Sequence, residues 1–233
     1  MAEQRTELRQ QFDGAHLAAY AKRILLPVVV LLAGMIGLGL LVTRTLHDVW
    51  PFTAEDGVNR WFAAHRGSPF DGLSMFFSFV GSTPCIIGVT AIAAFVLLRT
   101  LHRWAEPLFL CAAVSAQATV FFFTTLVIDR KRPGVSHMDD SPPTSSFPSG
   151  HTSAAVALYG GLALVLAGLL RHTWQQALCW ALVLMPVGVA LARLYRGMHH
   201  PSDVTASFLN GTLCIVIMSI AILHGGVRSA VRT

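Results

Sequence analysis

Three separated stretches of this sequence carry side chains whose types and spacing suit phosphate chemistry. They are Arg-Pro at 132–133, Pro-Ser-Gly-His at 148–151, and a stretch at 193–203 that begins with arginine and ends with aspartate. Arginine offers a planar fork of donors that fits phosphate oxygens. Asp203 follows His199 by four residues, so its carboxylate can hold that imidazole in one tautomer, as the orienting acid of a catalytic histidine does. These features favour binding and transfer of a phosphoryl group.

The second and third stretches also have structural interpretations. Ser149 is a good helix cap, and Gly150 allows close backbone approach. A helix start also binds anions, because its free N–H groups and its positive dipole end point to the same spot. In the third stretch Asp203 suits the first turn of a helix, with His199 then facing lipid headgroups. The sequence leaves these interpretations open beside the chemical one.

The composition predicts that membrane-spanning helices position the three stretches. The sequence is 54% hydrophobic and 12% charged, whereas roughly 25% of an ordinary soluble domain is charged. Its apolar residues form runs long enough to cross a hydrocarbon core of about 30 Å as helices. The net charge of +5 is not gathered into a basic run or a nucleic-acid-binding module. We therefore expect a lipid bilayer, and no nucleic acid, as the partner.

Six apolar runs predict an all-α fold, a bundle of six transmembrane helices. Their expected bounds are 24–43, 73–98, 107–128, 152–170, 177–192 and 204–224. The bundle forms one domain at 24–224, between a polar arm at 1–23 and a short tail at 225–233. Because the arm is long and carries acidic residues, we expect the first span to stay in the chain as a signal anchor.

Basic residues outside the three stretches indicate the orientation of the bundle. They are concentrated in the arm, the two short turns and the tail, at Arg5, Arg9, Lys22, Arg23, Arg99, Arg103, Arg171, Arg228 and Arg232. Apart from the three stretches and the adjoining Arg130 and Lys131, the opposite loops hold only Arg44, Arg60 and Arg66. By the positive-inside rule both termini are cytoplasmic, and all three stretches lie at the outer face of a plasma or inner membrane.

Several smaller features have structural interpretations. We expect 52–66 to form an outer interfacial helix, with the arm as its cytoplasmic counterpart. The Gly-Ser-Thr-Pro cluster at 81–84 should kink the second span. His137, Asp139 and Asp140 match no metal-ligand spacing, so we assign them to a headgroup-facing loop.

The cysteines and the second histidine of the third stretch also have simple interpretations. Cys85, Cys111, Cys179 and Cys214 lie in or beside apolar runs and form no Cys-x-x-Cys pair. They are interpreted as small buried hydrophobes rather than as disulfides or metal ligands. His200 is interpreted as an interfacial aromatic residue and not as a second catalytic group.

The order Arg-Pro, Pro-Ser-Gly-His and Arg-x5-His-x3-Asp resembles the three-part signature of the type-2 phosphatidic-acid phosphatase family. This family includes lipid phosphate phosphatases and bacterial undecaprenyl-diphosphate phosphatases, and the match extends over about 48–224. The resemblance implies that His199 attacks phosphorus and forms a phosphohistidine supported by Asp203. It implies that His151 protonates the leaving oxygen and then activates water. It also implies that four groups hold the phosphoryl oxygens without a metal or other cofactor: Arg132, Arg193, the Ser149 hydroxyl and the Gly150 N–H.

The sequence departs from the family signature in its first part. The usual motif is Lys-x6-Arg-Pro, but the residue seven positions before Arg132 is Thr125. Seven residues are two helical turns, so position 125 would face the same site. Threonine brings no charge, so Arg130 or Lys131 could replace the lysine, with Arg130 preferred. Otherwise the activity is lower or the substrate carries a different charge. Ala192 also stands where the family commonly has serine.

The sequence therefore predicts a membrane lipid phosphatase. A polyprenyl diphosphate, phosphatidylglycerophosphate and phosphatidic acid are all candidate substrates, with the polyprenyl diphosphate preferred by analogy. The alternative is a lipid-phosphate-binding or transport protein that keeps the anion site but has weakened catalysis, which the threonine at 125 supports. A vanadate-dependent haloperoxidase is disfavoured by the six spans. The sequence leaves the oligomeric state open.

Overall fold

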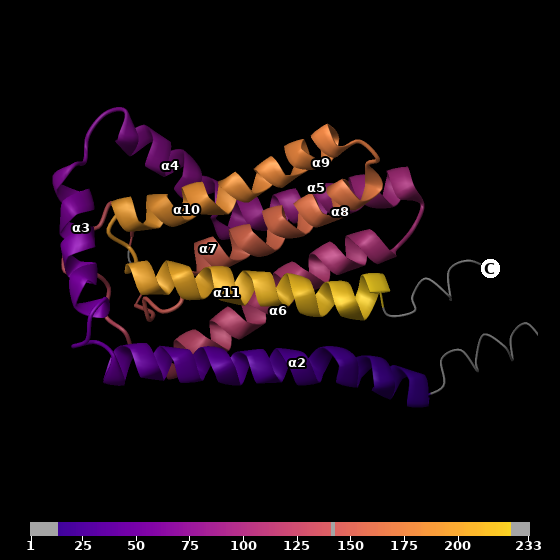
Figure 1. Ribbon diagram of the computed structural model, residues 1–233, viewed down its shortest axis with the longest axis horizontal. Coiled ribbons are helices and arrows are strands. Elements are labelled where there is room, and N and C mark those ends of the chain that lie inside the picture. The colour runs from indigo at the N-terminus through magenta and orange to yellow at the C-terminus, as the bar shows by residue number, and fades with distance from the viewer. Residues whose placement is uncertain (1–13, 141–142, 225–233) are drawn as a thin grey trace, which may run out of the picture.

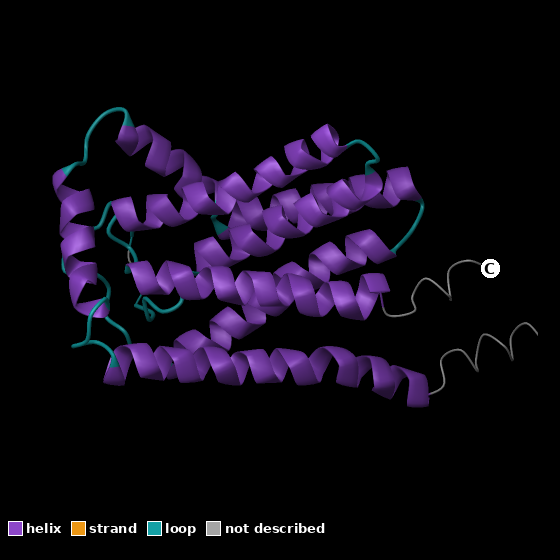
Figure 2. Cartoon of the chain, in the orientation of Figure 1, coloured by secondary structure: helices purple, strands orange, loops and turns teal. Residues whose placement is uncertain are grey.

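The structure, a computed structural model, describes residues 14–140 and 143–224. In these ranges every regular element is a helix (Figure 2). The α-helices are α2 (Gly14–Leu40), α3 (Glu55–Ala64), α4 (Phe70–Val80), α5 (Thr83–Leu101), α6 (Ala105–Val127), α7 (Gly150–Ala155), α8 (Gly161–Leu169), α9 (Thr173–Trp180), α10 (Leu184–Tyr195) and α11 (Pro201–Met218). Short π-helical or 3-10 segments extend or join them at Leu41–Thr45, Phe52–Ala54, Val156–Gly160, Ala181–Val183 and Ser219–His224.

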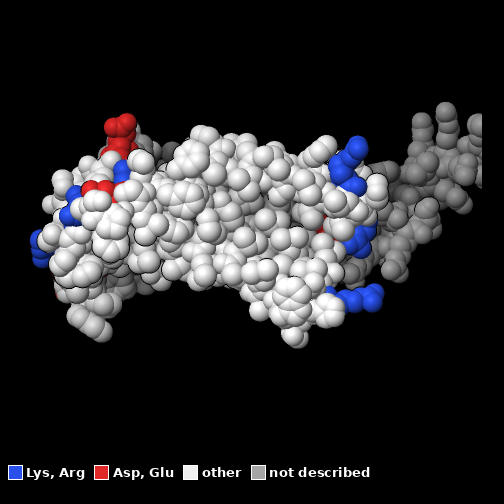
Figure 3. Space-filling model, turned by 90° about the horizontal axis from the view of Figure 1, so that it is seen from above, with Lys and Arg blue, Asp and Glu red and all other residues white. Residues whose placement is uncertain are grey.

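Six continuous helical stretches are long and apolar enough to cross a bilayer, which confirms the predicted all-α fold with six spans. They are Lys22–Thr45, Thr83–Leu101, Ala105–Val127, Gly150–Leu169, Thr173–Tyr195 and Pro201–His224. Large apolar side chains such as Val29, Phe95 and Leu178 are more than half exposed on their surface. Figure 3 shows charged side chains at the two ends of the molecule and an uncharged belt between them. This belt matches the hydrocarbon core of a membrane.

The prediction of one continuous helix at 73–98 as the second span is wrong, because the structure divides this segment into two helices. α4 ends at Val80, and Ser82 has extended backbone with φ −70° and ψ 151° before α5 begins. Pro84 has no N–H and fits the first turn of α5, where that donor would be unpaired. The cluster at 81–84 therefore breaks the helix instead of only kinking it. The eleven residues of α4 extend roughly 16 Å, too short to cross a membrane.

One end of the bundle is covered by α3, which confirms a helix within 52–66. In Figure 1 α3 lies across the bundle, while α2 begins and α11 ends at the opposite end. The arm at 1–23 is described only from residue 14, where it already belongs to α2. Residues 1–13 of the arm and the tail at 225–233 lie outside the described residues. The cytoplasmic position of the two termini stays a prediction.

The buried core surrounds α6, whose side chains Phe109, Leu110 and Ala113 are completely buried. They pack in one apolar cluster with Leu158 of the fourth span and Cys214 of α11. All four cysteines are free thiols, as the sequence predicts, although only Cys214 is fully buried. The core therefore fixes the third, fourth and sixth spans against each other, and the ends of these spans carry the three sequence stretches.

Replacing Gly211 with alanine is expected to destabilise the bundle. A Cβ at this position of α11 would lie 2.6 Å from Val156 Cβ and 2.8 Å from the Ser153 carbonyl oxygen. Neither atom can move without a backbone shift, and overpacking of this kind costs about 1–3 kcal/mol. Thermal unfolding in detergent should show a lower midpoint for G211A. In the matched control G88A the new methyl group meets open space, so an equal loss in both variants would contradict this explanation.

Candidate active site

A cavity of about 760 Å³ brings the three sequence stretches together. Arg132 lines it from the first stretch, Gly150 and His151 from the second, and Arg193 and His199 from the third. These residues come from the loop after α6, the start of α7, the end of α10 and the turn before α11. The meeting of the three stretches, which the sequence could only infer from topology, is thus a property of the fold.

The second stretch is held by a capped and tightly packed helix start. The Ser149 hydroxyl lies 3.0 Å from Thr152 Oγ1 and accepts from Thr152 N, and the Ser149 N–H donates to Ser207 Oγ at 2.7 Å. Ser149 is fully buried and does not line the cavity, so the structure assigns it to the helix cap. At Gly150 a Cβ would lie 2.8 Å from the Phe121 ring, so a larger residue there would have to displace that ring. His151 follows in the first turn and does line the cavity.

A sharp turn returns the third stretch to the cavity after α10. Gly197 has φ +72°, a conformation that other residues adopt at a cost, and a Cβ there would lie 2.8 Å from the Ser136 carbonyl oxygen. Asn59 of α3 then donates to the His199 carbonyl at 3.0 Å. α11 begins at Pro201, as the sequence predicts for the first turn of the sixth span. His199 is thereby fixed between two helix ends.

The His199 ring is oriented by a backbone carbonyl. Its Nδ1 lies 2.7 Å from the Ser146 carbonyl oxygen, and because a carbonyl can only accept, Nδ1 carries the proton and Nε2 keeps its lone pair. The Asp203 carboxylate lies 3.8 Å from Nδ1, beyond hydrogen-bonding distance. Asp203 therefore acts on His199 through its charge. The expectation that the Asp203 carboxylate holds the tautomer is corrected: the hydrogen bond that does so goes to the Ser146 carbonyl.

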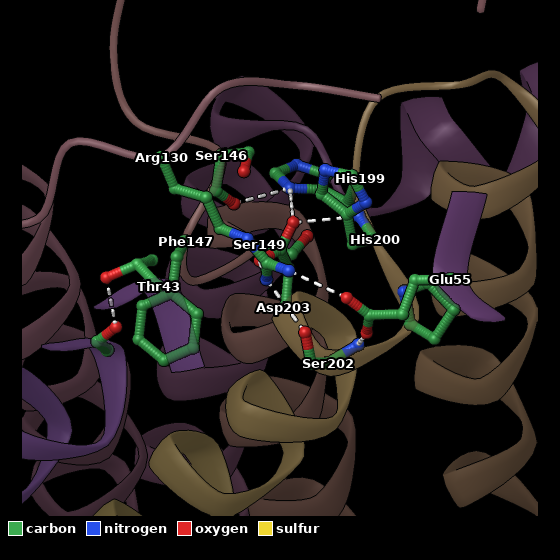
Figure 4. Close-up of polar contacts among 12 residues, drawn as sticks. Thr43, Glu55, Arg130, Ser146, Phe147, Ser149, His199, His200, Ser202 and Asp203 are labelled. Atoms are coloured by element: carbon green, nitrogen blue, oxygen red, sulfur yellow. Dashed lines mark hydrogen bonds and ion pairs between the residues drawn. The ribbon is translucent and has the colours of Figure 1, made fainter. Parts of the chain in front are cut away.

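Asp203 belongs to a buried relay of charged groups (Figure 4). It is completely buried, accepts from the His200 N–H at 2.8 Å and forms an ion pair with Arg130. Arg130 pairs in turn with Glu55 of α3 at 2.7 Å, and Glu55 accepts from the Ser202 N–H at 2.6 Å. Burying a charge is favourable only when it is paired and hydrogen-bonded, which this relay achieves.

The two arginines of the cavity retain donors that no protein group uses. Arg132 donates from Nη1 to the Met198 carbonyl at 2.8 Å, and Arg193 donates from Nη1 to Ser78 Oγ at 2.7 Å. The Nε atoms of both arginines are buried and have no hydrogen-bond partner in the described part of the chain. Buried donors without partners are rare and need an explanation. An anion bound between these arginines would supply one, since guanidinium groups suit phosphate oxygens.

Asp139 is the largest departure from the sequence interpretation. We assigned it to a headgroup-facing loop, but it lines the cavity and accepts from Arg193 at 2.6 Å. Its other oxygen accepts from Arg196 Nε at 2.8 Å and Nη2 at 2.6 Å. Burial alone would raise the pKa of Asp139, but the Arg196 hydrogen bond and the charges of both arginines outweigh it and hold that pKa below its ordinary value. Asp139 is therefore ionised at neutral pH.

The candidates for the missing lysine do not line the cavity. Thr125 donates its hydroxyl to the Phe122 carbonyl at 2.8 Å, and α6 ends two residues later, so the helical face does not continue to the first stretch. Lys131 is exposed, and Arg130 is committed to Glu55 and Asp203. His200 lies behind the cavity with Nε2 3.3 Å from the Lys131 carbonyl and caps α11.

Three residues near the site escaped the sequence interpretation: Glu55, Ser146 and the cavity-facing Asp139. Glu55 lies in a helix that the sequence described only as interfacial, and Ser146 acts through its backbone, which has no sequence signal. An acidic pair at 139–140 is visible in the sequence, but the inward direction of Asp139 depends on its contacts with Arg193 and Arg196. Long-range contacts of this kind are set by packing and not by local pattern.

Comparison with known proteins places this site in a family. The model of the PAP2 superfamily matches residues 107–224, about half of the chain. A solved PAP2 type phosphatidylglycerolphosphate phosphatase from Bacillus subtilis is 17% identical, with a TM-score of 0.72 over 88% of this chain and 97% of that chain. LpxE of Aquifex aeolicus is 21% identical, with a TM-score of 0.56 over 73% and 97%. At these identities both likenesses show the fold, and with the family match they lead to one conclusion. This chain belongs to the PAP2 superfamily.

Proposed function

We propose that this protein is an integral membrane phosphatase that hydrolyses a lipid phosphate ester through a phosphohistidine. One observation carries the proposal. His199 presents Nε2 beside two arginines whose Nε donors have no partner among the described residues, and all three side chains line one cavity. In His199 the proton is held on Nδ1, so Nε2 is free to act as a nucleophile. The guanidinium groups beside it can bind the phosphoryl oxygens, and this combination suits phosphoryl transfer.

In the first half-reaction His199 Nε2 forms a bond to phosphorus as the bond between phosphorus and the ester oxygen breaks. The leaving oxygen takes a proton from His151 and departs as an alcohol. Arg132, Arg193 and the Gly150 N–H at the helix start hold the nonbridging oxygens, where negative charge is concentrated. Ser149, which the family resemblance also suggests, keeps its part in capping this helix.

In the second half-reaction water attacks phosphorus and the bond from phosphorus to Nε2 breaks. His151, now neutral, accepts a proton from that water, so the pair of histidines returns to its starting state. Inorganic phosphate leaves. The fixed negative charge of Asp203 stabilises the positively charged ring that His199 becomes in the intermediate. We expect no metal in either step.

The walls of the cavity support a lipid as the substrate. Beyond the polar groups the wall is formed by Phe79 and Ile87 on one side and by Phe121 and Phe122 on the other. Phe79, Ile87 and Phe122 are each more than half exposed on the belt surface. An apolar chain can therefore reach from the bilayer into the cavity while its phosphate meets the arginines.

The orientation of the site is proposed from the distribution of charge. In Figure 1 α5 and α8 end where α2 begins. The described basic residues in and beside these helix ends are Lys22, Arg23, Arg99, Arg103 and Arg171, and Figure 3 shows basic side chains at this end of the molecule. Apart from the basic residues of the site and the adjoining Arg130 and Lys131, the opposite end holds Arg44, Arg60 and Arg66. By the positive-inside rule this difference supports a cytoplasmic position for the end where α2 begins, with the cavity on the outer side of the cell membrane.

The test is phosphate release from a panel of lipids by the purified protein in detergent with a chelator present. The panel contains phosphatidylglycerophosphate, which is named for the Bacillus protein, together with phosphatidic acid and a polyprenyl diphosphate. We expect release above the background of the His199→Ala variant from at least one lipid. Equal release by both proteins from every lipid would refute a phosphatase for this panel, and loss of activity with chelator would refute the metal-free mechanism.

A lipid-phosphate-binding or transport protein is the second candidate. Thr125 brings no charge to the cavity, and Asp139 already engages Arg193. Saturable binding of a lipid phosphate by wild type, with no release and no phosphoenzyme, would favour this candidate over the phosphatase.

Formation of the phosphoenzyme is expected to stay fast as the pH falls below about 6.5, the ordinary histidine pKa. Burial lowers the pKa of His199, with Arg193 acting in the same direction and Asp203 opposing it. The nucleophile must be neutral, so the rate falls only when the pH drops through this lowered pKa. NMR titration of the ring, assigned by difference from His199→Ala, measures it. A pKa at or above 6.5 would contradict the prediction.

A further inference from the structure

The wall of the cavity carries as many carboxylates as arginines. Arg132 and Arg193 face Asp139 and Asp140, which come from the same loop as Arg132. No further lysine or arginine lines the cavity among the described residues, since the position expected for a lysine holds Thr125, which points elsewhere. The carboxylates therefore offset part of the positive charge of the two arginines, although Arg196 pairs with Asp139 from outside the cavity lining.

Asp139 contacts Arg193 in the way that a phosphoryl oxygen would. Its Oδ2 accepts from Arg193 Nη1 at 2.6 Å and from Ser78 Oγ at 3.2 Å. Its Oδ1 is held separately by two donors of Arg196, a residue that does not line the cavity. Asp139 can therefore share Arg193 with a bound phosphate, or release it, while Arg196 still anchors the loop.

We propose that Asp139 is a specificity-determining residue that makes the site select lipid monophosphates over lipid diphosphates. The inference rests on the proposed phosphatase function. Because the carboxylate stands beside the phosphate position, it repels each bound group in proportion to that group's negative charge. A phosphate monoester carries about −1.5 to −2 at neutral pH, and a diphosphate ester carries at least one further charge. The repulsion therefore weakens the binding of a diphosphate more than the binding of a monophosphate.

The size of the effect follows from the charge that is removed. A unit charge acting over roughly 6–8 Å at an effective dielectric of ~40 changes an affinity roughly five- to tenfold. This preference for monophosphates replaces the polyprenyl diphosphate that family analogy suggested. It also agrees with the sequence-based alternative that a site without the usual lysine takes a substrate of different charge.

The first experiment uses wild-type protein and substrates that share one apolar chain, farnesyl phosphate and farnesyl diphosphate. We expect a higher kcat/KM for the monophosphate. Phosphate and pyrophosphate are then titrated as ligands, with thermal stabilisation of the protein as the readout, which requires no turnover. We expect pyrophosphate to bind no more tightly than phosphate despite its greater charge.

The second experiment repeats both measurements with Asp139→Asn, which keeps the shape and one acceptor but removes the charge. The ratio of pyrophosphate to phosphate dissociation constants should fall roughly five- to tenfold, and the kcat/KM preference should shift toward the diphosphate. The control is Asp140→Asn. It removes the same charge from an exposed cavity residue that has no arginine contact in the described part of the chain. We expect a smaller shift there, because solvent screens the charge.

Weaker binding of both anions by Asp139→Asn would overturn the proposal and make Asp139 a support for Arg193. An unchanged ratio, or wild-type preference for pyrophosphate and for the farnesyl diphosphate, would also overturn it. If Asp139→Asn does not fold, the two comparisons of monophosphate with diphosphate on wild-type protein still test whether the site prefers monophosphates. Failure of the phosphatase function gives a different result, since no lipid would then release phosphate while the anion dissociation constants could still be measured.

Discussion

Replacing His199 with alanine is expected to lower kcat at least about 10⁴-fold, because it removes the atom that we propose as the nucleophile. The change should leave the fold intact. The ring makes one hydrogen bond, to the Ser146 carbonyl, and the His199 backbone stays anchored through Asn59. KM should change much less than kcat, since the arginines that we propose bind the phosphate are untouched.

The measurement that identifies the nucleophile is trapping of the phosphoenzyme. Wild-type protein is quenched during turnover of a lipid that is labelled in its phosphate group. It should carry an acid-labile, base-stable phosphoryl group, and His199→Ala should carry none. His200→Asn is the matched control, because it removes the neighbouring imidazole while keeping a residue that can cap α11. Full activity in His199→Ala, or loss of the phosphoenzyme only in His200→Asn, would reassign the nucleophile.

Replacing Arg130 with methionine is expected to lower both stability and activity strongly. Asp203 is completely buried and Glu55 is 7% exposed, so the variant leaves two buried carboxylates without their shared cation. Breaking a buried charge network in this way costs about 3–5 kcal/mol. The midpoint of thermal unfolding should fall. Activity should fall with it, because Asp203 would protonate or turn away and no longer support His199.

Two further variants separate these effects. In Lys131→Met the adjacent cation is lost from an exposed side chain, and stability should stay within about 0.5 kcal/mol. The triple variant Glu55→Gln, Arg130→Met, Asp203→Asn removes every charge of the relay, so it should recover much of the stability lost by Arg130→Met. It should stay nearly inactive. An active triple variant, or an Arg130→Met variant as stable as wild type, would show that the relay does not position Asp203.

These ion pairs also explain why the sequence could not identify a replacement for the lysine that the family usually has at the position of Thr125. Arg130 is close to Arg132 along the chain, and proximity suggested that it faces the phosphate. The structure commits it to Glu55, which lies 75 positions away along the chain. A buried charge goes where it meets an opposite charge, and that meeting depends on how α3 crosses the end of the bundle.

The sequence by itself determined the membrane class, the six spans and the family, because these depend on local apolar runs and on short motifs with fixed spacing. It also determined which histidines, arginines and aspartate are candidates for the chemistry. Only the tertiary structure decided that α4 and α5 are separate, that the Ser146 carbonyl orients His199, and that Asp139 engages Arg193. The break falls at the 81–84 cluster, where the sequence predicted only a kink. The two site contacts join residues that are distant along the chain, where packing and charge pairing leave no local pattern to read.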